Sequence, residues 1–274
     1  MAGRPIVFLS DYGLGDEFVG VCHGVIARIS PTSQVIDLSH AVPAHDILRG
    51  ALLLIQSIRF MPTDAVYLVV VDPGVGTDRR AVAVESSGGP ILVGPDNGVL
   101  SLAWAALEGT LRACEITSPR VLLNPVAPTF HGRDVFAPAA AHLAAGMPLE
   151  QLGGPVELPS LARVGLPDPE IEDGRIRATI LGIDRFGNVQ LALRSTHLAG
   201  AQMDNLGQLQ VRTATRIAAA RRVETFAQVP EGHYGALVDS RGWLALVRRN
   251  ESAAQALGVQ VGDRILVEAP SPFG

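Results

Sequence analysis

The feature that most restricts the fold of this chain is an uninterrupted apolar run at residues 65–71, AVYLVVV. A strand without alternating polar residues is typical of the centre of a parallel sheet that helices cover on both faces. Strand-like runs at residues 5–10 and 34–38 precede it, and helix-like segments at residues 17–29 and 46–60 separate the three. This alternation predicts an α/β unit with an open, mostly parallel sheet and flanking helices.

The rest of the N-terminal half continues the same pattern. Further strands are expected at residues 81–85 and 91–93, and further helices at residues 98–107 and 134–145. Asp46 stands where a short polar side chain can cap the start of the second helix.

The pattern changes after about residue 150. Residues 153–168 are rich in glycine and proline and lack periodicity, which indicates a linker. Short strand-like segments then dominate, at residues 176–183, 189–193, 206–211, 235–238, 244–247 and 264–268. Only residues 252–257 resemble a helix. Closely spaced strands with glycine-bearing turns favour a small antiparallel barrel. We therefore predict an N-terminal α/β domain (1–155), a linker (156–172) and a smaller C-terminal β domain (173–274).

Charge and composition exclude several classes of protein. The chain has 22 basic and 27 acidic side chains, whereas proteins that bind nucleic acid through phosphates carry a surplus of Lys and Arg. No apolar run reaches the roughly 18 residues that span a bilayer, and no signal-peptide pattern is present. The two cysteines, Cys22 and Cys114, form no metal-binding or disulfide motif. We expect a cytoplasmic protein with no nucleic-acid or membrane partner.

Polar residues gather where the predicted strands end. Residues 10–13 (SDYG), 72–76 (DPGVG) and 94–98 (GPDNG) each follow a strand, and residues 130–134 (FHGRD) precede a helix. Ligands of open parallel sheets bind at this edge, and glycine lets the backbone approach them closely. No glycine-rich phosphate loop is present. An acidic edge can instead accept hydrogen bonds from ribose hydroxyls and attract a cation.

Six ordered motifs together resemble a known family. They are SDYG, VVDPGVGTDRR (70–80), GPDNG, HGRD (131–134), IDRFGN (183–188) and DSRG (239–242). Over nearly the whole chain they are similar to the S-adenosylmethionine hydroxide adenosyltransferases, hydrolytic relatives of fluorinase and chlorinase. The resemblance implies hydrolysis of S-adenosyl-L-methionine to adenosine and L-methionine. Because a sulfonium is already a good leaving group, we expect no metal and no cofactor. It also implies a homotrimer whose sites lie between the N-terminal domain of one subunit and the C-terminal domain of the next.

The resemblance also assigns roles in the N-terminal domain. Asp72, Arg79 and His131 correspond to the set that activates water, and the halogenating relatives carry a tyrosine where this chain has Asp72. Asp11 would hold the ribose hydroxyls. Phe130 and His45 would flank the ribose and the sulfonium, although fluorinase has a tryptophan in place of His45.

In the C-terminal domain the resemblance implies that Asp184 and Ser240 hold the amino-acid end of methionine. Phe186 and Asn188 would contact adenine, with Arg248 or Arg249 near it and Arg248 preferred.

Simpler interpretations remain for each motif taken alone. Asp and Gly are ordinary turn residues, and IDRFGN suits a hairpin turn. Two other functions stay open: a non-catalytic sensor of adenosine or S-adenosylmethionine, and a metal-dependent nucleosidase or phosphatase. The second would use Asp11, Asp16, Asp72 and Asp96 as Mg²⁺ or Ca²⁺ ligands. We predict no functional pairing for the remaining histidines, which are His23, His40, His142, His197 and His233.

Overall fold

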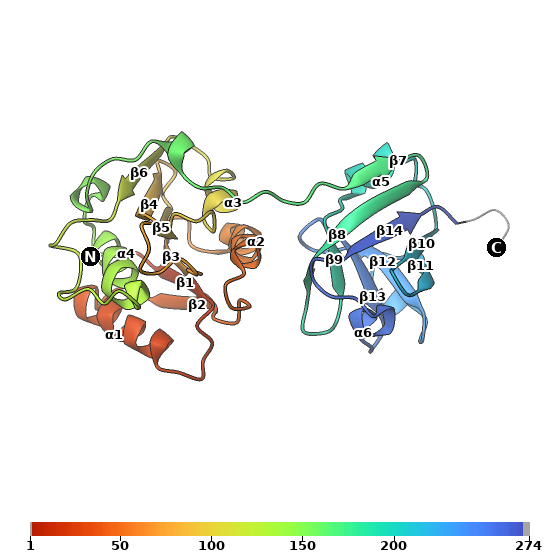
Figure 1. Ribbon diagram of the computed structural model, residues 1–274, viewed down its shortest axis with the longest axis horizontal. Helices are drawn as coiled ribbons and strands as arrows, with labels where there is room; N and C mark the ends of the chain where they lie inside the picture. Colours follow the sequence, from red (N-terminus) through yellow and green to blue (C-terminus); the bar gives the residue numbers. More distant parts are fainter. Residues whose placement is uncertain (1, 271–274) are drawn as a thin grey trace. The chain divides into compact units, whose positions relative to one another are not determined.

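The computed structural model describes residues 2–270. The chain forms two compact units, Met1–Val164 (unit 1) and Gly165–Gly274 (unit 2) (Figure 1). The division falls within the stretch 156–172 that composition predicts as a linker. Leu161, inside that stretch, is buried in the core of unit 1. No helix in the described residues is long and apolar enough to cross a membrane.

Unit 1 is built on a six-stranded sheet with the order β2-β1-β3-β5-β4-β6. Its strands are β1 (Ile6–Ser10), β2 (Val35–Ser39), β3 (Val66–Val70), β4 (Ala81–Ser86), β5 (Ile91–Pro95) and β6 (Leu111–Glu115). The pairs β2–β1, β1–β3 and β3–β5 are parallel, whereas β4 pairs antiparallel with β5 and β6. The predicted mostly parallel sheet is confirmed, with β6 as a strand that the sequence pattern did not reveal.

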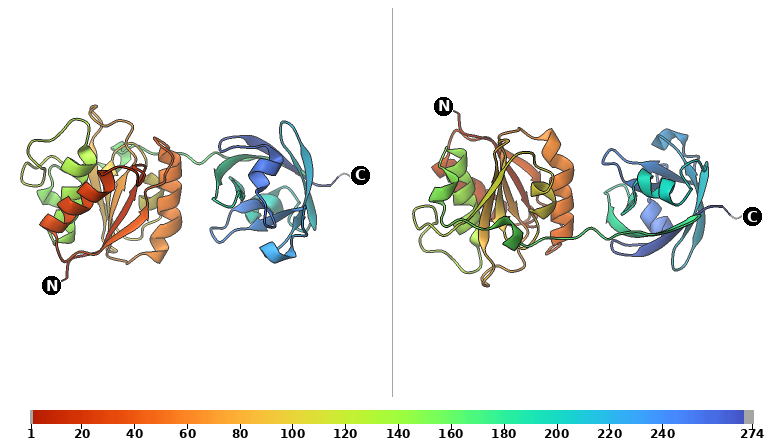
Figure 2. Two further views of the ribbon diagram at one scale, coloured as in Figure 1. Left: turned by 90° about the horizontal axis from the view of Figure 1, so that it is seen from below. Right: turned by 90° about the horizontal axis from the view of Figure 1, so that it is seen from above.

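Helices cover both faces of this sheet, so unit 1 has three layers (Figure 2). On one face α1 (Phe18–Ile29) and α4 (Ala137–Ala144) pack against the side chains of Phe8 and Leu68. On the other face α2 (Ile47–Ser57) packs against the alternate positions of the same strands. Burial on both faces explains why the central strands β1 and β3 consist almost entirely of apolar residues.

The helix boundaries follow local hydrogen bonding. Asp46 caps α2 as predicted, because its Oδ1 accepts a hydrogen bond from the backbone N–H of Arg49 at 2.9 Å. The expected helix at 98–107 is shorter: α3 covers only Ser101–Trp104 and closes through a tight turn in which Leu107 N–H bonds to Trp104 C=O. The expected helix at 134–145 begins as a wider π-helical turn, η2 (Gly132–Phe136), and π turns are frequent at functional sites.

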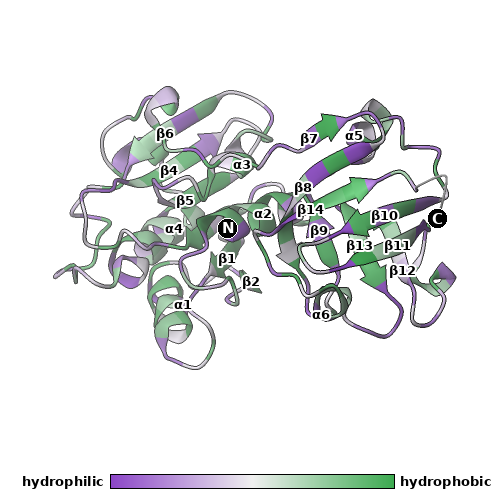
Figure 3. Ribbon diagram, turned by 45° about the vertical axis from the view of Figure 1, so that its right-hand side comes forward, coloured by the Kyte–Doolittle hydropathy of each residue, from purple (hydrophilic) through white to green (hydrophobic). Residues whose placement is uncertain are grey.

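Unit 2 is a closed β-barrel with few helices. Its strands are β7 (Glu170–Glu172), β8 (Arg175–Ile183), β9 (Val189–Leu191), β10 (Gln208–Arg212), β11 (Ile217–Arg222), β12 (Tyr234–Val238), β13 (Leu244–Arg248) and β14 (Arg264–Glu268). The order is β14-β10-β11-β12-β13-β9-β8-β7, and the pairing of β14 with β8 closes the ring. Strands such as β8 and β10 carry both hydrophobic and hydrophilic residues (Figure 3), with the hydrophobic ones buried inside the barrel. The predicted small β-barrel is confirmed.

Four details of unit 2 differ from the sequence expectation. β7 lies inside the stretch 156–172 that was predicted as a linker, and it pairs with β8. β11, with the sequence IAAARR, was not predicted because alanine has little preference for strands. It also pairs in parallel with β12, whereas an antiparallel barrel was expected. The expected helix near 252–257 is present as α6 (Ala253–Leu257), but a second short helix, α5 (Ser195–Gly200), accompanies it.

Candidate active site

The carboxyl edge of the unit 1 sheet carries a cavity of about 270 Å³. Its two acidic residues follow adjacent parallel strands, because Ser10 of β1 pairs with Val70 of β3 and Asp11 and Asp72 come soon after these positions. The cavity is lined by Asp11, Tyr12, Phe18, Ala44, His45, Asp72, Val75, Thr129, Phe130, His131 and Gly132. All five cavity residues that sequence reasoning named in this unit, namely Asp11, His45, Asp72, Phe130 and His131, therefore lie together.

Arg79 joins the carboxylate and the imidazole at this cavity. Its Nε donates a hydrogen bond to Asp72 Oδ1 at 2.8 Å, and its Nη2 donates to Asp72 Oδ2. The same Nη2 lies 2.8 Å from Nδ1 of His131. The side chains of Arg79 and Asp72 are only 10% and 6% exposed, so this two-pronged ion pair is held rigidly and its geometry is specific. The Phe136 ring of η2 lies 5.1 Å from the guanidinium carbon.

The contact with Arg79 fixes the protonation of His131. A guanidinium only donates hydrogen bonds, so Nδ1 of His131 must accept, and the proton of the neutral ring resides on Nε2. Burial lowers the pKa of His131 below its ordinary 6.5, and the charge of Arg79 lowers this pKa further against the opposing effect of Asp72. His131 is therefore neutral at pH 7 and offers an Nε2–H donor.

Asp11 and His45 are linked through the backbone. Oδ2 of Asp11 accepts a hydrogen bond from the backbone N–H of His45 at 2.9 Å. His45 has a φ of +68°, a conformation that non-glycine residues seldom adopt, and this hydrogen bond helps to hold it. The loop before α2 is thereby fixed against the acidic end of β1.

Three aromatic rings form a wall of the cavity. Tyr12, Phe18 and Phe130 contact one another with centroids 5.3–5.9 Å apart. A Cβ atom at Gly132 would lie 1.9 Å from the Tyr12 hydroxyl oxygen, so only glycine permits the present position of this ring. Sequence reasoning named Phe130 but missed Tyr12 and Phe18 as members of the site; the position of Tyr12 directly after Asp11 was the available signal.

The GPDNG motif does not reach the cavity, contrary to its expected place at a ligand-binding edge. Asp96 accepts hydrogen bonds from Arg80 Nε and from the backbone N–H of Ala162, both at 2.8 Å. The Asn97 amide donates to the carbonyl of Val71 at 2.8 Å. These side chains are structural: they connect β5 to the neighbouring strand and to the end of unit 1.

The four carboxylates of the metal-enzyme alternative do not form an ion site. Asp72 is paired with Arg79, and Asp96 with Arg80. Within residues 2–270, groups of three potential ligands among His, Cys, Asp and Glu are confined to His23, Asp37 and His40.

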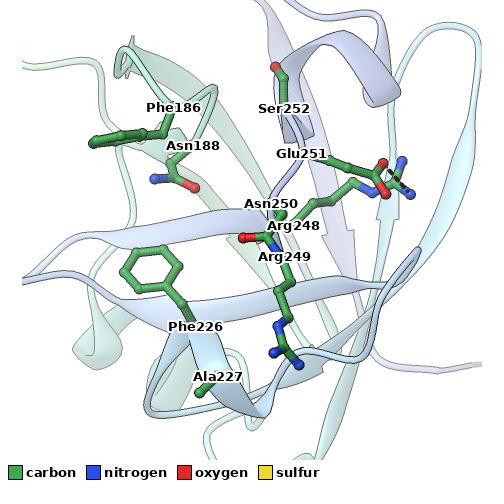
Figure 4. Close-up of a pocket in the computed structure, with 9 residues that line it drawn as sticks. All are labelled: Phe186, Asn188, Phe226, Ala227, Arg248, Arg249, Asn250, Glu251 and Ser252. Atoms are coloured by element: carbon green, nitrogen blue, oxygen red, sulfur yellow. Dashed lines mark ion pairs between the residues drawn. The ribbon is translucent and has the colours of Figure 1, made fainter.

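Unit 2 carries a second pocket, of about 560 Å³ (Figure 4). It is lined by Phe186, Asn188, Phe226, Ala227, Arg248, Arg249, Asn250, Glu251 and Ser252. Phe186 and Phe226 are 71% and 52% exposed, and the Asn188 amide lies between them in the view of Figure 4. Phe226, in the short helix η5 (Phe226–Gln228), was missed by sequence reasoning because no motif surrounds it. Exposed aromatic rings beside an amide suit a flat heterocycle.

Arg248 belongs to this pocket, but its charged end is occupied. Its Nη2 lies 2.8 Å from the Glu251 carboxylate and donates to the carbonyl of Gly232 at 3.0 Å. The aliphatic part of the side chain is therefore what Arg248 offers to a ligand.

Asp184 and Ser240 do not line the pocket. The Asp184 carboxylate accepts hydrogen bonds from the backbone N–H groups of Phe186 and Asn188, both at 2.9 Å, and from the Asn188 amide at 2.8 Å. Asp184 thus holds the hairpin turn between β8 and β9, which presents Phe186 and Asn188. Ser240 is exposed in the turn between β12 and β13.

Comparison with known proteins agrees with this layout. Residues 6–153 match the SAM hydroxide adenosyltransferase N-terminal domain and residues 178–266 match the corresponding C-terminal domain. Proteins named (R)-S-adenosyl-L-methionine hydrolase are 46% identical in Salinispora tropica (98% of this chain, 100% of that protein) and 42% identical in Thermus thermophilus (94% and 97%). A fluorinase of Nocardia brasiliensis is 30% identical over 97% of each chain.

A solved structure also matches this chain over nearly its whole length. The crystal structure of an uncharacterized conserved protein from Thermotoga maritima superposes with a TM-score of 0.88 and 32% identity, over 96% of this chain and 99% of that one. Both domains are matched in order and the sequence relatives are covered almost completely, so the chain belongs to the SAM hydroxide adenosyltransferase family.

Proposed function

We propose that this protein hydrolyses S-adenosyl-L-methionine to adenosine and L-methionine. The observation that carries the proposal is the contact of Asp72, Arg79 and His131 beside a cavity that Asp11 also lines. A protein that only senses a ligand has no use for such a set, and relatives at 42–46% identity are named (R)-S-adenosyl-L-methionine hydrolase.

The reaction needs a positioned and activated water. The water oxygen forms a bond to C5′ as the C5′–S bond breaks, and the electron pair goes to sulfur, which becomes the neutral thioether of methionine. A sulfonium is already a good leaving group, so no acid is required. Holding the water in line with C5′ can contribute about 7 kcal/mol or more to lowering the barrier. Removing its proton with a positioned base adds on the order of 10²–10⁴-fold.

We assign acceptance of the water proton to Asp72. Nδ1 of His131 is occupied by Arg79 and its Nε2 carries a proton, so the neutral imidazole acts as a donor that orients the water. Arg79 holds both groups in place and stabilises the negative charge that develops on the attacking oxygen. No step in this account uses a metal or another cofactor.

The substrate parts fit the lining of the two pockets. Asp11 accepts hydrogen bonds from ribose hydroxyls, and His45 and the rings of Tyr12 and Phe130 flank the sulfonium, which aromatic faces attract. In unit 2, adenine stacks on Phe186 and Phe226, with Asn188 reading its edge and the Arg248 stem beside it. Ser240, which lines neither pocket, is assigned to the amino-acid end of methionine by the family resemblance alone. Asp184 contributes to binding by holding the turn that carries the adenine contacts.

We further propose that the active form is a cytoplasmic homotrimer, with each site between unit 1 of one subunit and unit 2 of the next. Unit 1 carries the reacting groups, and unit 2 carries the proposed adenine pocket. A complete site therefore needs one unit of each kind. Large apolar side chains are exposed at both: Leu14 is 79% exposed in the loop after Asp11, and Phe186 is 71% exposed in unit 2. No nucleic acid or membrane takes part.

The direct test is a chromatographic time course of the purified protein with S-adenosylmethionine, with and without EDTA. We expect adenosine and methionine in equal amounts at rates that EDTA does not abolish. A folded protein that binds the substrate without releasing adenosine would instead support the sensor function. Loss of turnover in EDTA, restored by Mg²⁺ or Ca²⁺, would support the metal-dependent enzyme.

Replacement of Asp11 by alanine is expected to weaken substrate binding more than turnover. The lost hydrogen bonds to the ribose are made in the ground state as well as in the transition state, and a bond to a charged group contributes about 1.5–3 kcal/mol, or roughly 10–100-fold in affinity. Calorimetric titration with S-adenosylmethionine and steady-state kinetics measure the two effects. Asp16→Ala, an exposed carboxylate in the same loop, serves as the control. Unchanged affinity in Asp11→Ala would remove Asp11 from the site.

The pH profile should show the lowered pKa of His131. Its acid form cannot accept the hydrogen bond from Arg79, so kcat/KM should fall only as the pH drops through a pKa below 6.5. The same lowered pKa means that the unfolded chain binds the proton more readily. The contribution of His131 to stability is therefore complete above pH 6.5 and is lost between 6.5 and the lower folded pKa. A His131→Gln variant should lack this fall of kcat/KM at acid pH. A fall centred above pH 6.5 in the wild type would contradict the assignment.

A further inference from the structure

A group of three potential metal ligands lies in unit 1 outside the lining of the reacting cavity. His23 comes from α1, Asp37 from β2, and His40 follows the end of β2. Nε2 of His23 lies 2.9 Å and Nε2 of His40 lies 3.0 Å from the same oxygen, Oδ1 of Asp37. One ligand atom from each residue falls within 4.8 Å of the others. The two histidines for which the sequence indicated no pairing are thus brought together by the docking of α1 beside β2.

The geometry of His40 is what points to a ligand. Its side chain is 3% exposed, and its Nε2 contacts Asp37 Oδ1 at 3.0 Å, outside the alignment of a regular hydrogen bond. A buried ring nitrogen that lies this close to a carboxylate oxygen without hydrogen-bond alignment is costly when nothing lies between them. The arrangement of His40 Nε2, Asp37 Oδ1 and the neighbouring imidazole of His23 resembles that of three ligands around one cation.

The other nitrogen of His40 is already held as the outer shell of a metal site would hold it. Nδ1 lies 2.7 Å from the hydroxyl oxygen of Ser10, which also accepts a hydrogen bond from the backbone N–H of Tyr12 at 3.3 Å. Metal-binding histidines almost always donate their second ring N–H to an oxygen, which fixes the ring and directs the free lone pair of the other nitrogen toward the metal. When Nδ1 of His40 donates to the Ser10 hydroxyl, the free lone pair lies on Nε2, which faces Asp37.

We propose that His23, Asp37 and His40 form a binding site for one divalent transition-metal ion, with Zn²⁺ as the best fit. Two imidazoles and one carboxylate are ligands that Zn²⁺ takes in tetrahedral sites, with water at the fourth position. At bond lengths of about 2.0–2.1 Å, tetrahedral ligand atoms are about 3.3 Å apart, so the observed contacts of 2.9 and 3.0 Å need to open by a few tenths of an ångström. Mg²⁺ and Ca²⁺ prefer sites made of oxygen atoms.

The site is accessible and is connected to the substrate-binding loop. The side chains of His23 and Asp37 are 36% and 43% exposed, so an ion can enter from solvent. His40 also accepts a hydrogen bond at its carbonyl from the N–H of Gly13 at 2.7 Å. A bound ion would therefore fix α1 and β2 to each other and to the loop that carries Asp11 and Tyr12. It would stabilise unit 1 without taking part in the chemistry at Asp72.

The test uses the untagged full chain after removal of metals with EDTA. Calorimetry measures its binding of Zn²⁺, and visible absorption spectroscopy examines a second sample loaded with Co²⁺. Wild type should bind one ion per chain and give the intense bands of tetrahedral Co²⁺. His23→Gln is the main variant because His23 is partly exposed and its replacement leaves the core intact; affinity should fall at least about 10–100-fold. Asp37→Asn should weaken binding in the same way. His233→Gln, an exposed histidine whose ring contacts only a backbone carbonyl, should bind as wild type.

Thermal unfolding provides a second readout that does not depend on activity. Zn²⁺ at a hundred times its Kd should raise the Tm of wild type and of His233→Gln by about 5–10 °C, and that of His23→Gln far less. Two results would overturn the proposal: folded wild type that retains no Zn²⁺, or equal affinity and equal Tm shifts in wild type and His23→Gln. Either result would leave the proposed hydrolysis untouched, because the product time course tests that reaction separately.

Discussion

The Asp72→Asn variant is expected to have a kcat about 10²–10⁴-fold below wild type, with affinity for S-adenosylmethionine little changed. The amide occupies nearly the same space as the carboxylate but cannot take the proton of the attacking water. Because the lost interaction acts on the water rather than on the ground-state substrate, binding should persist. Single-turnover kinetics give the rate of the chemical step, and calorimetric titration gives the affinity.

Two controls separate chemistry from folding in this experiment. Asp72→Ala removes the partner of the nearly buried Arg79, which destabilises the site as well as inactivating it, so its Tm should fall below that of Asp72→Asn. Asp78→Asn changes an exposed carboxylate of the same loop and should keep kcat within about twofold of wild type. A large loss of affinity in Asp72→Asn with unchanged kcat would refute the assigned role.

Two variants that should each lose most of their activity are expected to regain part of it when they form mixed trimers. Asp72→Ala removes the proposed reacting group of unit 1, and Asn188→Ala removes a proposed adenine contact of unit 2. If a site combines unit 1 of one subunit with unit 2 of the next, a randomly mixed ring contains about a quarter of its sites with both units intact. Activity near that fraction of wild type should therefore appear after co-expression, measured as adenosine released per subunit.

The matching control mixes Asp72→Ala with Asp72→Asn, which damage the same unit and should restore nothing. Light scattering on the same samples gives the number of subunits and shows whether mixed assemblies formed. Trimers that contain both Asp72→Ala and Asn188→Ala subunits yet stay inactive would contradict sites shared between subunits.

The fold of unit 1 and the core of its site could be predicted because they depend on short-range rules. Apolar runs predict buried strands, parallel order follows from the intervening helices, and residues after adjacent strands meet at one edge. Asp11 and Asp72 come together for this reason. The role of Arg79 is different: seven residues after Asp72, it returns to the carboxylate only through the turn at residues 73–78, which pattern alone does not determine.

Other features depend on how elements dock, and the sequence carries little signal for that. His23 and Asp37 meet only because α1 presents one particular face beside β2. GPDNG has the composition of a ligand-binding turn, yet its side chains serve internal contacts to Arg80, Val71 and Ala162. Asp184, similarly, satisfies the backbone of its own turn. In GPDNG and at Asp184, the same side chains could either close a loop or bind a ligand, so the residue types alone do not distinguish the two roles.

The pairing of β8 with β14 has a consequence for how the protein is made. These are the first and last strands of the closed ring, with Arg175 opposite Glu268, so the ring cannot close during synthesis until almost the whole of unit 2 has left the ribosome. Contacts this distant along the chain also form slowly. Unit 1, whose parallel core of β1, β3 and β5 is complete by Pro95, has its framework available much earlier. We therefore expect newly made chains to hold a folded unit 1 before the barrel of unit 2 closes, and the proposed adenine pocket of unit 2 to be the last part to mature.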